Sequence, residues 1–186
     1  MDRLTLLIIN FLVFHTCWLA NAFGAAHDIT LLGPAFILPG IVLHLLLIDD
    51  LSREAVLIVG VATVGYVIDA LHLQAGVLNF KSGQMFYVFP PVWMFFQWMI
   101  FATLFRLSLD WLKGRYWAAS ILGAVGGPFS YWAAAQLDAI MIKSLGYSLT
   151  VMAVSWALLM PAFIWYAHRG SENSQIPSTV VNKEAV

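Results

Sequence analysis

Long hydrophobic runs separated by short polar stretches dominate the chain and predict a bundle of membrane-spanning helices. A helix needs roughly 20 apolar residues, at about 1.5 Å each, to cross the ~30 Å hydrocarbon core of a bilayer. Six runs reach about this length, at residues 4–23, 29–48, 54–73, 87–109, 116–137 and 147–168. Because the connections are short, we expect residues 1–168 to form one all-α domain, a six-transmembrane-helix bundle. The polar segment 169–186 lacks this pattern and is expected to be a disordered tail.

The fourth run is the segment around which the others are organised, because it combines apolar length with polar groups. As a helix from Pro90 to Leu112 it would gather several polar and aromatic side chains within about 40° of one another, at 100° per residue. These are Trp93, Gln97, Leu104, Ser108 and Trp111. Lipid offers no hydrogen-bond partner for an amide, so this face is expected to line an enclosed space. The run is therefore predicted to be a helix at the centre of the bundle.

Polar side chains of other runs fall at a similar depth. Depth is counted along each helix from the end that holds the N-terminus, which the basic residues below predict to be cytoplasmic. On this count Asn21, Asp69, Gln97 and Tyr131 lie in the outer half of the bilayer, roughly 17–26 Å deep. His44 lies near the other face and should not join them. We predict a pocket that opens outward, lined by Asn10, Trp18, Asn21, Trp93, Gln97, Ser108 and Trp111.

Asp69 is the strongest candidate for chemistry, because an ionised carboxylate in hydrocarbon must be paired, protonated or hydrated. His72, three residues later on the same helical face, is its nearest candidate partner. One interpretation is a catalytic group of Asp69, His72 and Tyr131, with Tyr131 donating a proton, or a site for a polar headgroup. The other is a structural pair at a helix end. The sequence favours neither.

The distribution of basic residues predicts the orientation of the bundle, since cytoplasmic loops carry an excess of Lys and Arg. With six spans, one side of the membrane holds Arg3, Arg53, Arg106, Lys113, Arg115, Arg169 and Lys183. The other side holds Lys81 and Lys143. We therefore expect both termini in the cytoplasm.

The first run also has one feature of a cleavable signal peptide. Residues 20–22, Ala-Asn-Ala, resemble the small-residue site that precedes cleavage. However, the only basic residue before the run is Arg3, and Asn10 and His15 interrupt the apolar centre. These features favour a helix that is retained.

Two further patterns predict helix packing. Ala119, Gly123 and Gly127 recur every four residues in the fifth run, the spacing of a seam along which helices approach closely. Pro128 follows and is expected to kink that helix. Near the cytoplasmic boundary, Arg106 and Asp110 are four residues apart, as in a salt bridge on one helix.

Composition excludes several classes of protein. Only 10% of the 186 residues are charged, against about 25% in soluble domains. A net charge of −1 gives no basic footprint for nucleic acid. The single cysteine, Cys17, excludes an internal disulfide and a cysteine zinc site. The spacings of His15, His44 and His72 do not fit a metal site, so we predict no metal and no cofactor.

Four motifs resemble those of an uncharacterised family of small bacterial inner-membrane proteins, a domain of unknown function. They are Asn10-x3-Phe14-x3-Trp18, Pro91-x-Trp93-Met94, Ser108-Leu109-x-Trp111-Leu112 and Gly126-Gly127-Pro128-x-x-Tyr131. The chain departs from the family pattern at Gln97, where Leu is expected. The resemblance implies a multi-pass protein of the inner membrane and no particular activity.

Three functions fit these patterns. The first is an intramembrane enzyme or lipid-handling factor that binds membrane lipid or another apolar small molecule in the outer-half pocket. The second is a transporter of a small solute or lipid. The third is a non-catalytic membrane scaffold or subunit. The sequence leaves homo-oligomerisation open.

Overall fold

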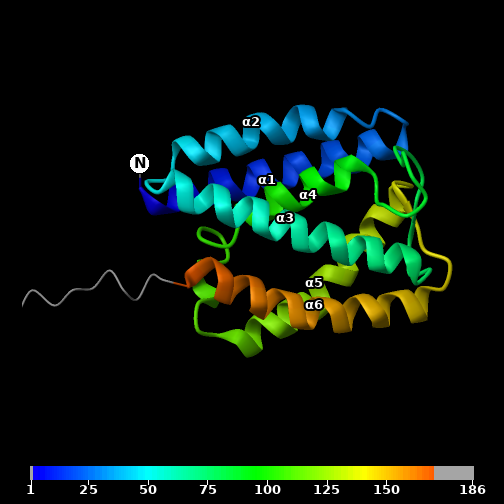
Figure 1. The fold of residues 1–186 in the computed structure, drawn as a ribbon. Helices are drawn as coiled ribbons and strands as arrows, with labels where there is room; N and C mark the ends of the chain where they lie inside the picture. Colours follow the sequence, from blue (N-terminus) through cyan, green and yellow to red (C-terminus); the bar gives the residue numbers. More distant parts are fainter. Residues whose placement is uncertain (1, 170–186) are drawn as a thin grey trace, which may run out of the picture.

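A computed structural model describes residues 2–169, and within this part of the chain six α-helices lie side by side (Figure 1). The helices are α1 (Arg3–Ala26), α2 (Leu32–Leu46), α3 (Leu51–Gln74), α4 (Val92–Ala102), α5 (Tyr116–Gln136) and α6 (Leu145–His168). A short 3-10 helix, η1 (Asp110–Leu112), precedes α5. Strands β1 (Asn79–Phe80) and β2 (Ile140–Met141) pair antiparallel and join two connections at one end. The expected all-α class is therefore confirmed, while residues 170–186 of the expected tail lie outside the described residues.

The helices form two groups, visible one above the other in Figure 1. In the first group α4 packs against α1, α2 and α3. In the second, α5 packs along α6, and α6 contacts α3. Helices α1, α3 and α5 begin at the same end of the molecule, where α2 and α6 end. The fourth run was predicted to lie at the centre of the bundle, and α4 holds this position within the first group of helices.

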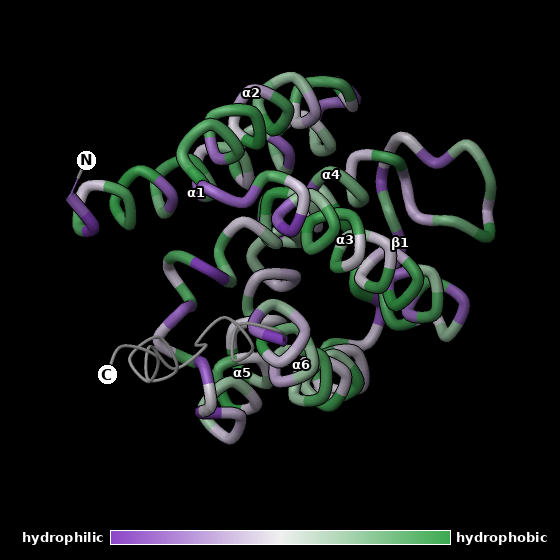
Figure 2. Tube along the Cα trace, turned by 60° about the vertical axis from the view of Figure 1, so that its left-hand side comes forward, coloured by the Kyte–Doolittle hydropathy of each residue, from purple (hydrophilic) through white to green (hydrophobic). Residues whose placement is uncertain are grey.

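Three helices are long and apolar enough to cross a membrane, namely α1, α3 and α6, whereas α2 and α4 are shorter apolar helices. Hydrophobic residues predominate along the helices in Figure 2, and the hydrophilic ones gather mostly at helix ends and connections. Large apolar side chains such as Val125, Phe129 and Leu158 are 60% or more exposed. Surfaces of this kind are rare on water-soluble monomers and suit contact with lipid.

The prediction of one helix through Leu112 is wrong, because α4 ends at Ala102. At this point the Thr103 hydroxyl donates to the Ile100 carbonyl (2.7 Å), and the backbone changes to tighter bonds such as Leu104 N–H to Phe101 O. A hydroxyl that bonds nearby carbonyls competes with the helix in this way. The chain then turns inward, and Phe105 becomes fully buried against the ring of Phe163. Burial of Phe105 therefore overrides the helical pattern of the sequence.

Glycines determine how closely α5 approaches α6. A Cβ on Gly123 would lie 2.3 Å from the Trp156 carbonyl oxygen, and one on Gly127 would lie 2.2 Å from the Trp156 ring. Any larger residue would push the helices apart. By contrast, a Cβ on Gly126 would meet no heavy atom within 4 Å. Pro128 lies inside α5 and is buried.

Candidate functional site

A cavity of about 450 Å³ lies between the two groups of helices. Its walls come from α1, α4, residues 104–109, α5, residues 139–140 and α6. On α1 it extends from Phe11 to Ala22, and on α5 from Leu122 to Ala134. These intervals correspond to roughly 16–18 Å at the helical rise per residue. The cavity is therefore an elongated slot that runs along the helices.

Uncharged side chains make up almost all of the lining. Aromatic residues include Trp18, Trp93, Trp98 and Trp156, and among the described residues the one titratable base in the wall is His15, at the rim. The rim also includes Phe11, which is 52% exposed, and Leu122, which is 37% exposed. The slot thus has an apolar interior that is reached from the side of the bundle, between α1 and α5.

A few polar groups converge on this interior. Asn21 donates from Nδ2 to Gln97 Oε1 (3.0 Å) and to the Trp93 carbonyl (3.1 Å). Within residues 2–169 the amide nitrogen of Gln97 makes no hydrogen bond, so its two N–H groups remain available. The buried indole N–H of Trp156 has no partner in the same part of the chain. A binding site is typically apolar with a few such polar groups.

Asp69 lies behind the cavity wall and is fully buried. It accepts a hydrogen bond at Oδ2 from the Trp98 indole (2.6 Å) and another at Oδ1 from the Tyr131 hydroxyl (2.5 Å). Trp98 and Tyr131 both line the cavity. One carboxylate on α3 thereby fixes one wall residue from α4 and one from α5. Asp69 is placed to orient the wall rather than to touch a ligand.

His72 lies beside Asp69 as expected, with 3.8 Å between His72 Nδ1 and Asp69 Oδ1, a distance that allows an ion pair but is too long for a hydrogen bond. The other ring nitrogen, Nε2, lies 3.0 Å from the Ser155 hydroxyl. Since that hydroxyl donates to the Val151 carbonyl (2.9 Å), it accepts from His72. His72 Nδ1 then faces Asp69 without a hydrogen-bond partner among residues 2–169. Asp69 and His72 are therefore close neighbours, while the hydrogen bond of the His72 ring goes to Ser155.

Residues 7–162 match the model of a family described as a protein of unknown function, DUF2878. The chain belongs to this family. The match covers four of the six helices in full and most of α1 and of α6, and it includes every residue that lines the cavity. No curated protein and no solved structure matches the chain significantly. Membership in DUF2878 therefore supports the resemblance seen in the sequence and assigns no activity.

In the structure of this DUF2878 chain, some of the predicted pocket residues line the cavity and others do not. Those that line it are Trp18, Asn21, Trp93, Gln97 and Ser108.

Two other predicted residues do not. Asn10 bonds a lining residue rather than lining the cavity itself: it accepts from the Ser108 hydroxyl (2.6 Å) and donates to the Thr103 carbonyl (3.2 Å). Trp111 lies on the surface and is 53% exposed, because the helix that would have turned it inward ends at Ala102.

Two features of the DUF2878 chain were missed by sequence reasoning. Trp98 and Trp156 stack with ring centroids 5.0 Å apart and form a cavity wall, but a Trp in a hydrophobic run carries no signal that separates packing from a site.

The second is a buried cluster at the cytoplasmic end predicted from the basic residues. Glu54, which is fully buried, accepts from His44 Nε2 (2.9 Å) and Arg106 Nη1 (3.0 Å). The expected pair of Arg106 and Asp110 is therefore wrong, and Asp110 pairs with Arg3 at 2.8 Å. An acid at the start of an apolar run could have indicated this cluster.

Proposed function

We propose that this protein is a lipid-handling factor of the bacterial inner membrane that holds a membrane lipid, or another apolar ligand, in the cavity between α1 and α5. The observation that carries the proposal is the elongated slot with an aromatic, uncharged lining and a lateral rim. In a bilayer that rim would face acyl chains, so a ligand would enter from the membrane without crossing water. Burial of its apolar surface would drive binding, at about 25 cal/mol per Å².

The proposed topology has six crossings with both termini in the cytoplasm. Helix α4 alone is about 16 Å long, so its crossing would be completed by residues 103–112. In support, Arg3, Arg53 and Arg169 lie at the end of the molecule where α1 and α3 begin and α6 ends. Lys81, which pairs with Asp138, lies in the connection at the opposite end. This distribution follows the excess of basic residues on the cytoplasmic side.

The cavity lining suggests which kind of ligand would bind. A phosphate headgroup would need a cation, and the described lining contains no Lys or Arg. The Gln97 amide and the Tyr131 hydroxyl would instead meet a hydroxyl, carbonyl or amide at the polar end of the ligand. We therefore propose a ligand with a single apolar chain and an uncharged polar end.

Tyr131 is the proposed contact to that polar end, and Asp69 is a positioning residue. The Tyr131 hydroxyl donates its proton to Asp69, so its oxygen lone pairs remain able to accept from a ligand hydroxyl. If the protein is an enzyme, Tyr131 would accept a proton from the ligand and pass its own hydroxyl proton to Asp69. His72, beside Asp69, would be the next proton acceptor. A carrier or scaffold role would need the binding contact alone.

The test is to fill the cavity and measure the lipid that co-purifies. Gly126→Phe would place a ring in the slot at a position with open space for a Cβ, so the fold should tolerate it. Gly146→Phe is the matched control, since Gly146 is also open but lies outside the cavity lining. We expect mass spectrometry of mild-detergent extracts to find lipid bound to the wild type and to Gly146→Phe, and little bound to Gly126→Phe. Equal lipid in all three would refute the proposal.

A further inference from the structure

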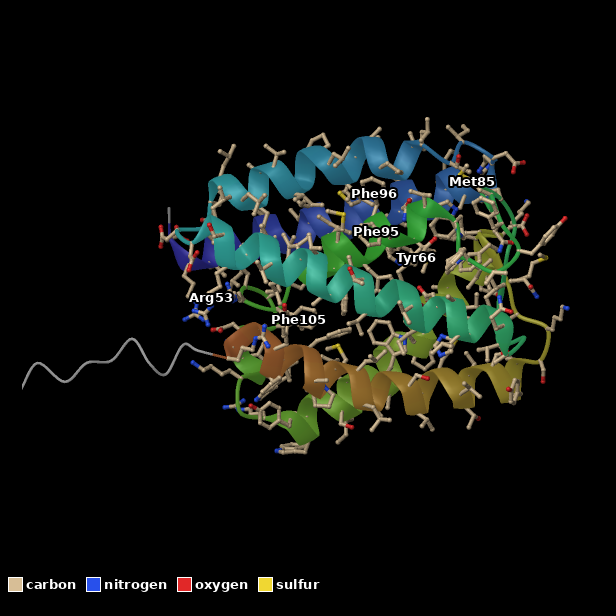
Figure 3. All side chains as sticks on the ribbon, in the orientation of Figure 1. Arg53, Tyr66, Met85, Phe95, Phe96 and Phe105 are labelled. Atoms are coloured by element: carbon tan, nitrogen blue, oxygen red, sulfur yellow. The ribbon has the colours of Figure 1, made fainter. Side chains whose placement is uncertain are left out.

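A second hollow of about 330 Å³ is lined by residues of α3 and α6, at the end of the bundle where α3 begins and α6 ends. Arg53, Arg106 and Arg169 line it together with Ser52 and Tyr166. Figure 3 shows Arg53 at this end of the molecule. None of these residues lines the larger cavity.

Arg106 is held rigidly in this hollow. Its side chain is 17% exposed, its Nη1 donates to Glu54 (3.0 Å), and its Nε donates to the Ala167 carbonyl (2.9 Å). Its Nη2 makes no hydrogen bond to any residue from 2 to 169. A flexible arginine that reaches for interfacial water would not be fixed on two sides in this way. The free nitrogen is therefore a preorganised donor.

Arg53 and Arg169 add charge that nothing in the described chain neutralises. Arg53 Nη2 donates to the Arg169 carbonyl (2.6 Å), and the Arg169 guanidinium lies 4.1 Å above the Tyr166 ring. Neither arginine has a carboxylate within 4 Å among residues 2–169. The neighbouring acid, Glu54, is already bonded to Arg106 and His44. Among the described residues, three arginines and no carboxylate line the hollow.

We propose that this hollow is a binding site for a phosphate group. Guanidinium groups match the oxygens of phosphate with paired, charge-assisted hydrogen bonds, and three of them meet here. The hydroxyl of Ser52, in the first turn of α3, would add a neutral donor, and the positive end of that helix favours an anion. The phosphate could belong to the headgroup of an anionic lipid or to a soluble phosphate compound, because both present the same oxygens.

The experiment measures the unfolding temperature of the full-length protein in an uncharged detergent by its tryptophan fluorescence. One arm adds inorganic phosphate against chloride of equal ionic strength. The other adds dioleoyl phosphatidylglycerol against dioleoylglycerol, which has the same chains without the phosphate. A rise with phosphate indicates a soluble source, and a rise with phosphatidylglycerol alone indicates a lipid headgroup. Either result supports the site, and no rise in either arm overturns it.

Variants separate this site from general surface charge. The double variant Arg53→Gln with Arg169→Gln should lose the rise. Arg3→Gln with Arg115→Gln removes the same charge from the same end of the bundle, outside the hollow, and should retain the rise.

If the first variant does not fold, Ser52→Glu provides an independent test. It places an acid in the hollow at an exposed position near a helix start, where an acid is tolerated. Loss of the rise in the Arg3 and Arg115 control, or its retention in Ser52→Glu, would contradict the proposal. Gly126→Phe should leave the rise unchanged, so this test does not depend on the lipid cavity.

Discussion

Two carboxylates on α3, Glu54 and Asp69, are both fully buried, yet their surroundings differ. Glu54 bonds a cation, Arg106, and His44 from α2. About 22 Å further along the helix, Asp69 bonds two neutral donors, Trp98 and Tyr131. Breaking a buried ion pair leaves a charge without compensation, whereas a neutral donor left alone costs only its own desolvation.

The two carboxylates have different structural roles. Glu54 joins α2, α3 and the chain after α4, and none of its direct partners lines the cavity. The two donors to Asp69 come from the two groups of helices, and both line the cavity. Glu54 should therefore matter for stability, and Asp69 for the shape of the site.

Glu54→Gln should have the largest effect on stability, because it leaves Arg106 buried without its counter-charge. We expect a loss of about 3 kcal/mol in the free energy of unfolding. Titration with a denaturing detergent, followed by tryptophan fluorescence, measures this. Replacing both partners, with Glu54→Leu and Arg106→Leu, should recover part of the loss. A loss below about 1 kcal/mol in the free energy of unfolding of Glu54→Gln would contradict the stabilising role assigned to Glu54.

Asp69→Asn should cost less, about 1–2 kcal/mol, because an amide oxygen still accepts from one of the two donors. It should nevertheless reduce co-purified lipid, since Trp98 and Tyr131 would no longer be held together. The same titration and lipid extraction serve as the readouts. A loss of stability equal to that of Glu54→Gln, with lipid unchanged, would reverse the tasks proposed here.

Tyr131→Phe removes one hydrogen bond and leaves Asp69 bonded to Trp98, so the expected loss of stability is about 1 kcal/mol. The effect on ligand should be selective, because the ring is retained and the hydroxyl is not. Lipid extraction should show less of the ligand that carries a hydroxyl or carbonyl end. Full retention of every lipid would exclude Tyr131 as the polar contact.

Arg3→Gln should have the smallest effect, within about 0.5 kcal/mol, because surface ion pairs are worth little. The Arg3 side chain is 77% exposed, and it pairs with Asp110 outside both hollows. It is therefore the reference against which the other changes are read. A loss of stability as large as that of Asp69→Asn would show that the unfolding assay does not distinguish an exposed ion pair from buried hydrogen bonds.

Sequence patterns predicted the helical class and most helix positions, because hydrophobic length is a strong local signal. They failed after Ala102, where burial of Phe105 and the bond between Arg106 and Glu54 decide the path of the chain. These are contacts between distant residues, and helical periodicity cannot reveal them.

The candidate site was predicted in part. Gln97 and Tyr131 stood out as polar groups in hydrocarbon, and both line the cavity. Tyr131 was grouped with Asp69 from the sequence, and the structure joins the two by a hydrogen bond across 62 residues of chain. The other partner, Trp98, is 29 residues from Asp69 and was not predicted. His72 was favoured for its proximity in sequence, and its Nδ1 lies 3.8 Å from Asp69 Oδ1, but the hydrogen bond of its ring goes to Ser155 on α6.

Photo-crosslinking tests the central claim most directly, with a lipid that carries a diazirine in the middle of its chain. Trp156 and Met160 line the cavity but are 6% and 3% exposed, so surrounding lipid reaches them poorly. The account predicts that peptide mapping finds label on Trp156 or Met160 in the wild type, and that Gly126→Phe removes it. Label confined to outward residues such as Val125 and Phe129 would contradict the account.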